Sequence, residues 1–145
     1  MLVRCAGGDG NLLFNIGPMP TGEIAPEQRE RLTQMGQWLE KNGESIRGTR
    51  GGPFKPGSYG VSTRKANTVY LHLAEGMTGT VRLPPIPARV LRSRALSGGT
   101  VEVRQTDSSL EISVADKDRQ PIDTVVALEL DTPTLTLAAL NVPEP

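Results

Sequence analysis

The pattern of apolar and polar residues divides the chain into two regions that meet near residues 51–60. The first region contains a short apolar run, residues 11–16, between a glycine-rich segment and Gly17-Pro18. Its length and the breakers on either side predict a strand that is buried on both faces. Such a strand normally has parallel neighbours in a sheet. The rest of the chain offers no second unit that would supply them.

A helix is predicted over residues 26–42. Pro26 suits the first helical turn, where its missing N–H would have no partner anyway, and Asn42-Gly43 is a typical stop signal. An apolar stripe recurs at helical spacing along this segment: Leu32, Met35 and Leu39, with Trp38 at its edge. The predicted strand, loop and helix together make half of a βαβ unit, which indicates a piece of a larger fold.

The second region is predicted to be an antiparallel β-sandwich domain over residues 61–131. Its apolar and polar residues alternate with a period of two in short runs separated by turn-forming residues, which is typical of such a sandwich. The alternating runs are 69–74, 81–83, 101–104, 110–114 and 125–130. Residues 51–60 are expected to link the two regions, and residues 132–145 to form a loose tail or an edge segment. The predicted fold class is therefore mainly β.

Composition excludes several classes of function. The 145 residues carry 16 Lys and Arg against 16 Asp and Glu, so the chain lacks the basic excess of a nucleic-acid-binding protein. No apolar run is long enough for a transmembrane helix, and the N-terminal residues do not resemble a signal peptide. With one cysteine, Cys5, and one histidine, His72, there is no cysteine-rich or His-pair metal motif. We therefore expect no nucleic acid, membrane, metal or cofactor.

Few residues qualify as catalytic candidates. His72 lies in a predicted strand without a second His or Cys nearby, and a structural histidine is much more common in that setting than a catalytic one. Glu23, Glu27 and Glu30 cluster at the start of the predicted helix, where the helix dipole favours negative charge. The paired acids of glycosidases usually come from different strands instead. Taken alone, the residues define no catalytic constellation.

Several motifs follow one another in the first region. They are Gly10-Asn11-Leu12-Leu13-Phe14-Asn15-Ile16-Gly17-Pro18, Thr21-Gly22-Glu23-Ile24, Gly36-Gln37-Trp38-Leu39, Asn42-Gly43-Glu44-Ser45-Ile46 and Gly48-Thr49-Arg50. In order and spacing these motifs resemble the α-L-fucosidases of glycoside hydrolase family 29. Residues 62–65, 69–73 and 122–130 are similar to the C-terminal domain of some members. Phe14 stands where the family usually has leucine.

The resemblance implies that the chain is the C-terminal portion of a fucosidase-like enzyme. Residues 1–50 would be a remnant of a catalytic (β/α)8 barrel, with its last strand at about 11–16 and its last helix at about 26–42, followed by the C-terminal antiparallel β-sandwich. The intact enzyme would hydrolyse terminal α-L-fucosides of glycans by a retaining mechanism, with an aspartate nucleophile and a second carboxylate as acid and base. In the family both carboxylates lie upstream of the matched stretch. The chain therefore has no catalytic residue of its own, and we expect it to be inactive alone.

Asn15 and Met19 are the residues that the resemblance places nearest to substrate, because barrel active sites form at the C-terminal ends of the strands. For Asn15, a hydrogen bond that holds the strand end to the following loop is the alternative role. Two other functions stay open for the whole chain, a carbohydrate-binding sandwich and a structural or interaction module. In the last case the exposed barrel faces would pair with another copy of the chain or with the barrel portion. Family members are often secreted, periplasmic or lysosomal.

Overall fold

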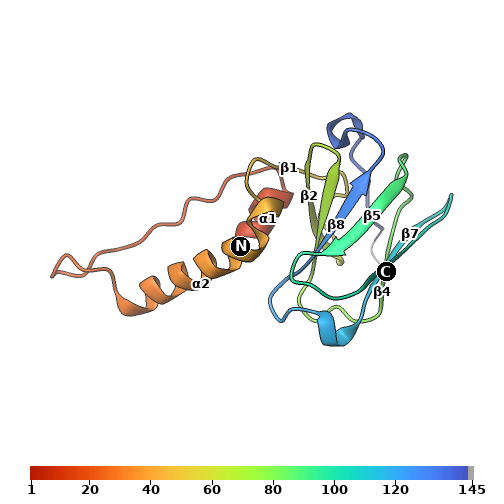
Figure 1. Ribbon diagram of the computed structural model, residues 1–145. Helices are drawn as coiled ribbons and strands as arrows, with labels where there is room; N and C mark the ends of the chain where they lie inside the picture. Colours follow the sequence, from red (N-terminus) through yellow and green to blue (C-terminus); the bar gives the residue numbers. More distant parts are fainter. Residues whose placement is uncertain (144–145) are drawn as a thin grey trace.

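Two antiparallel sheets packed face to face form a β-sandwich in the computed structural model, which describes residues 1–143 (Figure 1). The larger sheet has the strand order β1-β2-β3-β8-β5, and the smaller sheet has the order β4-β7-β6. The strands are β1 Arg50–Gly51, β2 Gly60–Lys65, β3 Thr68–Leu73, β4 Thr80–Leu83, β5 Val90–Ala95, β6 Val101–Gln105, β7 Leu110–Val114 and β8 Thr124–Leu130. The antiparallel sandwich predicted for the second region is confirmed.

Two α-helices precede the sandwich and lie on the side of the larger sheet. The longer helix projects away from the sandwich (Figure 1). They are α1 Leu2–Gly7 and α2 Pro26–Asn42, the second of which covers the range in which a helix is predicted. Three short 3-10 helices complete the described elements: η1 Gly43–Ser45, η2 Asp116–Asp118 and η3 Thr134–Thr136. Within residues 1–143, no helix has the length and apolar character that crossing a membrane would need.

The main core lies between the two sheets. Val69, Leu71 and Leu73 point inward from β3, as their alternation predicts, and pack in one cluster with Leu110 and Ile112 of β7. All five side chains are buried. Each contributes roughly 1.5–3 kcal/mol relative to an exposed position. Aliphatic residues dominate this cluster, so the core is a conventional sandwich interior.

The outer face of the larger sheet is buried as well. Tyr70 of β3 and Val125 and Ala127 of β8 form a second cluster, against which Trp38 of α2 packs. Close contact also occurs at α1, where a Cβ added to Gly7 would overlap the Val61 side chain. This face is covered by α1, η1 and the end of α2. Nearly every residue of β3 and β8 is therefore buried.

Residues 11–16 form no strand in the structure, which corrects the prediction. The segment is extended beside α2, and the backbone groups of residues 11–16 have no backbone hydrogen-bond partner among the described residues. Its apolar side chains face solvent: Leu13 is 86% exposed and Phe14 is 42% exposed. The difference is explained by the lack of neighbouring strands. A strand buried on both faces needs neighbouring strands, and residues 1–143 supply none to it.

The two segments at the ends of the sandwich are packed rather than loose. Phe54, within the expected linker, is fully buried in the core, and Ser62 Oγ donates to its carbonyl oxygen at 2.9 Å. Leu140, within the expected tail, pairs in parallel with Phe54. Thr134 and Leu137 are also buried. The final residues of the expected tail, 144–145, lie outside the described residues.

Substitution of Gly60 tests how tightly β2 is held against β3. Gly60 has φ +123°, and a Cβ at this position would overlap the backbone oxygen of His72. We expect Gly60→Ala to lower the free energy of unfolding by about 2–4 kcal/mol, because both the backbone conformation and the pairing of β2 with β3 oppose a side chain. Urea unfolding measures the loss. Gly76→Ala is the matched control, with φ +77° and open space around its Cβ. An equal loss in both variants would contradict the role given to the strand pairing.

Candidate functional site

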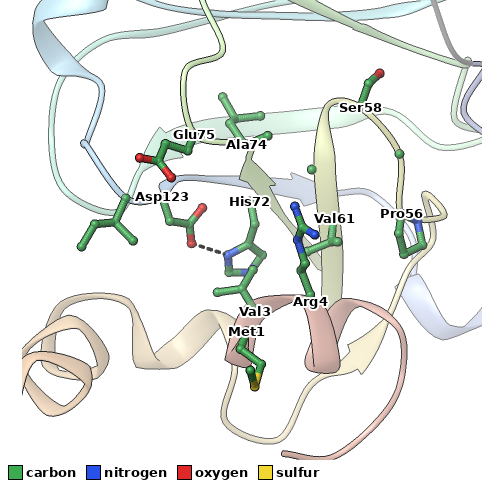
Figure 2. Close-up of a pocket in the computed structure, with 14 residues that line it drawn as sticks. Met1, Val3, Arg4, Pro56, Ser58, Val61, His72, Ala74, Glu75 and Asp123 are labelled. Carbon is green, nitrogen blue, oxygen red and sulfur yellow. Dashed lines mark hydrogen bonds and ion pairs between the residues drawn. The ribbon is translucent and has the colours of Figure 1, made fainter. Parts of the chain in front are cut away.

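A pocket of about 880 Å³ lies between α1 and one end of the larger sheet (Figure 2). His72 of β3 and Asp123, which directly precedes β8, line it together with Val61 of β2. Arg4 of α1 and Glu75, in the turn after β3, contribute exposed charged side chains. The pocket therefore joins elements from both regions of the chain.

His72 and Asp123 form a buried pair at this pocket. His72 Nδ1 lies 2.8 Å from Asp123 Oδ2, and the two side chains are 1% and 8% exposed. The antiparallel pairing of β3 with β8 brings the two residues together, because His72 lies opposite Val125. Burial of two such polar groups is tolerated because each satisfies the other.

Thr63 extends the pair into a chain of three side chains. Its Oγ1 lies 3.4 Å from His72 Nε2 and donates a hydrogen bond to the backbone oxygen of Ser45 at 2.5 Å. A hydroxyl, an imidazole and a carboxylate in this order resemble a catalytic triad. Thr63 is fully buried, however, and its proton is directed to Ser45. The hydroxyl therefore cannot reach a substrate in this conformation, and the chain of contacts holds η1 onto the sheet.

Trp38 connects α2 to the same face of the sheet. Its ring lies 6.3 Å from the His72 ring, measured between centroids, with the planes tilted by 34°. It also packs against the cluster of Tyr70, Val125 and Ala127. Trp38 Nε1 is buried without a hydrogen-bond partner among the described residues. The contact of α2 with the sheet is thus mainly apolar.

Glu44 of η1 adds a charged contact to this attachment. Its carboxylate accepts hydrogen bonds from Arg94 of β5 at 2.8 and 2.9 Å and from the Tyr70 hydroxyl at 3.3 Å. Burial raises the pKa of Tyr70, and the negative charge of Glu44 raises it further. Lys65 Nζ donates to the backbone oxygen of Arg47 at 3.1 Å. The turn after α2 is therefore bound to three strands of the larger sheet.

Asp9 attaches the turn after α1 to β1. Its carboxylate accepts hydrogen bonds from Arg50 at 2.8 and 2.6 Å and from the Gly51 backbone N–H at 2.9 Å. The hydrogen bond from Arg50 and the one from Gly51 lower the pKa of Asp9 to about 2. This contact, like the Glu44 contact, joins the first region to the sandwich.

Asn15 and Met19, the residues predicted to lie nearest to substrate, are not part of the pocket at His72. Asn15 is exposed in the extended segment, and no hydrogen bond joins its side chain to the following loop within the described residues. Met19 is half-buried in a turn, where its N–H donates to the Glu23 oxygen at 2.8 Å. Neither residue lines the pocket at His72. Their proximity to a substrate stays a prediction.

The sequence pattern placed His72 on the outer face of its strand but did not indicate its partner. Asp123 lies far along the chain from His72, and only the pairing of β3 with β8 brings it close. Across residues 1–143, no group of three or more His, Cys, Asp or Glu side chains is arranged to hold a metal ion. His72 and Asp123 themselves are joined by the hydrogen bond described above.

Comparison with known proteins matches both regions to one family. A family model described as alpha-L-fucosidase matches residues 1–44. Alpha-L-fucosidase of Branchiostoma floridae is 54% identical over 41 residues, which are 28% of this chain and 9% of that protein. Tissue alpha-L-fucosidase of Mus musculus is 36% identical over 77 residues, 53% of this chain and 16% of that protein. The structure of alpha-L-fucosidase isoenzyme 1 from Paenibacillus thiaminolyticus superposes with a TM-score of 0.78 at 28% identity, covering 89% of this chain and 32% of that one.

A β-sandwich behind a helical segment is shared with these enzymes over most of the chain, so the chain is similar to a C-terminal part of known glycosidases. Within that class the chain resembles the α-L-fucosidases in particular, because the family model matches most of the first region and the structural match extends through the second. The chain spans less than a fifth of the two curated relatives and about a third of the Paenibacillus chain.

Replacement of Thr63 tests the attachment of η1 to the sheet. Thr63→Val keeps the shape of the side chain but removes the hydrogen bond to the buried Ser45 carbonyl group. We expect a loss of about 1–3 kcal/mol in the free energy of unfolding, because that group loses its hydrogen-bond donor. Thr80→Val is the control, since Thr80 shares an exposed hydrogen bond with Ser113. Urea unfolding of both variants makes the comparison, and an unchanged Thr63→Val protein would be the contrary result.

The contact of Asp9 with Arg50 predicts how the stability of the folded chain depends on pH. Asp9 has a pKa of about 2 in the folded chain, below the ordinary value of 3.8. Its contribution to stability is therefore complete above about 3.8 and is lost as the pH falls through about 2. Carbon NMR of the Asp9 carboxyl group should show a midpoint near 2. In Arg50→Gln the midpoint should return toward 3.8, and a midpoint that does not move would exclude Arg50 as the cause.

Proposed function

We propose that this chain forms the C-terminal part of a retaining α-L-fucosidase. In this proposal the sandwich supports the last strand and helix of a catalytic (β/α)8 barrel, and the intact enzyme hydrolyses terminal α-L-fucosides of glycans. The similarity of the chain to alpha-L-fucosidases supports the reaction class. The 145 residues on their own are inactive, since none of them corresponds to the family's nucleophile or acid/base carboxylate.

The observation that carries this proposal is the exposed apolar segment beside α2. Leu13, Phe14, Ile16 and Ile24 are all exposed, and residues 11–16 make no backbone hydrogen bond to another described segment. A single extended segment of this kind is unfavourable in water because it exposes apolar surface, and its unpaired peptide groups are open to pairing with another strand. Parallel barrel strands would satisfy both needs at once. The same segment lies inside the family-model match.

The burial of the aromatic side chains disfavours an independent carbohydrate-binding role. Sugar-binding surfaces usually present exposed aromatic rings. Tyr59 and Tyr70 are 2% and 5% exposed, and Phe54 is fully buried. Burial also raises the pKa of Tyr59 to about 12, with its hydroxyl donating to the Phe54 backbone oxygen at 3.1 Å. These rings belong to the core and to the attachment of η1, so the sandwich serves mainly as a support.

A fucosidase assay tests the proposal. With 4-nitrophenyl α-L-fucopyranoside the chain alone should show no turnover, whereas a product of the same gene that includes roughly 250–300 residues of barrel before Met1 should be active. Leu13→Asp in that longer product should lower activity at least tenfold, because a charge would replace an apolar barrel contact. Leu135→Asp, an equally polar change at an exposed sandwich position, should leave activity unchanged. Turnover by the 145 residues alone would overturn the proposal.

A further inference from the structure

We propose that the pocket at His72 and Asp123 binds a small zwitterion, with the ligand's ammonium group at Asp123 and its anionic group at Arg4. This inference concerns the junction of α1 with the larger sheet and does not depend on the fucosidase reaction. It rests on three charged side chains that line one pocket: Arg4 and Glu75, which form no ion pair within residues 1–143, and Asp123, whose ion-pair partner there is His72.

Asp123 supplies the first part of the argument. One carboxylate oxygen, Oδ2, is held by His72 at 2.8 Å, and the side chain is 8% exposed. The other oxygen, Oδ1, accepts no hydrogen bond from the described residues. Figure 2 shows this oxygen directed away from His72, on the side of the pocket where Glu75 lies. A buried carboxylate with a free oxygen is a strong acceptor for a charged donor.

Arg4 and Glu75 supply the second part. The other ion pairs of the surface use Arg50, Arg82, Arg94 and Arg119, each with a carboxylate within 4 Å. Arg4 and Glu75 line the pocket and take part in no ion pair or side-chain hydrogen bond within the described part of the chain. The pocket thus offers one guanidinium group and two carboxylates that remain available to a ligand.

The composition of the lining selects the ligand class. No aromatic ring other than the buried imidazole lines the pocket, so the usual stacking surface for a sugar is missing. Hydroxyl groups would compete poorly with water for exposed charges, whereas an ammonium group forms a charge-assisted hydrogen bond with a buried carboxylate. Arg4 prefers an anionic partner such as a carboxylate. A ligand that carries both groups matches the two signs of charge in this lining.

An NMR titration of the isotopically labelled chain tests the proposal. The probes are glycine, β-alanine and 4-aminobutyrate, which vary the distance between the charges, with ethylammonium, acetate and L-fucose as comparisons. At least one zwitterion should cause saturable shifts of the His72, Leu73 and Asp123 amide signals. Ethylammonium should bind about tenfold more weakly, because it lacks the contact with Arg4.

Variants of the pocket distinguish a built site from general charge effects. Arg4→Gln should reduce zwitterion binding to the level of ethylammonium, and Glu75→Gln should weaken both probes. Both residues are exposed, so these variants should fold even if Asp123→Asn does not. Arg104→Gln and Glu102→Gln, on β6 of the smaller sheet, are the charge-matched controls and should change nothing. No saturable shift, saturation by L-fucose alone, or binding that is insensitive to Arg4→Gln would overturn the proposal.

Discussion

The burial of the centre of the larger sheet, β3 and β8, on both of its faces is the constraint on which the rest of the structure depends. Its inner face carries the core residues of the sandwich, and its outer face carries Tyr70, His72 and the buried residues of β8. An outer face of this composition is stable only under a cover. The helical region supplies that cover through Trp38 and Ser45. The two regions are therefore physically interdependent, although their sequence patterns differ.

The cover is attached in two chemically different ways. Near its centre, the partly buried Trp38 packs on the sheet and the buried Thr63 contacts Ser45. At its margin, exposed ion pairs such as Glu44–Arg94 and Asp9–Arg50 fix the orientation. Exposed ion pairs contribute little stability each. The buried contacts therefore supply most of the free energy that holds the helical region to the sheet. The exposed ion pairs mainly fix the orientation of that region.

Local patterns were sufficient to predict α2 and the strands β3, β7 and β8, because their periodicity is set by the side chains themselves. The strand predicted over residues 11–16 is absent because a buried parallel strand depends on neighbouring strands, and the local pattern carries no information about them. Phe54 looked like part of a linker because glycines and prolines surround it. The His72–Asp123 pair could not be predicted from either residue. It follows from strand order, and an alternating sequence does not specify which strands will pair.

The pairing of Phe54 with Leu140 brings the first and last segments of the sandwich into contact. The centre of the larger sheet, where β3 pairs with β8, also joins residues distant in sequence. During synthesis from the N-terminus, β2 and β3 therefore leave the ribosome well before their final neighbours exist. The edge of β3 that pairs with β8 stays without its partner until residues 124–130 emerge, which favours slow, late completion of the larger sheet.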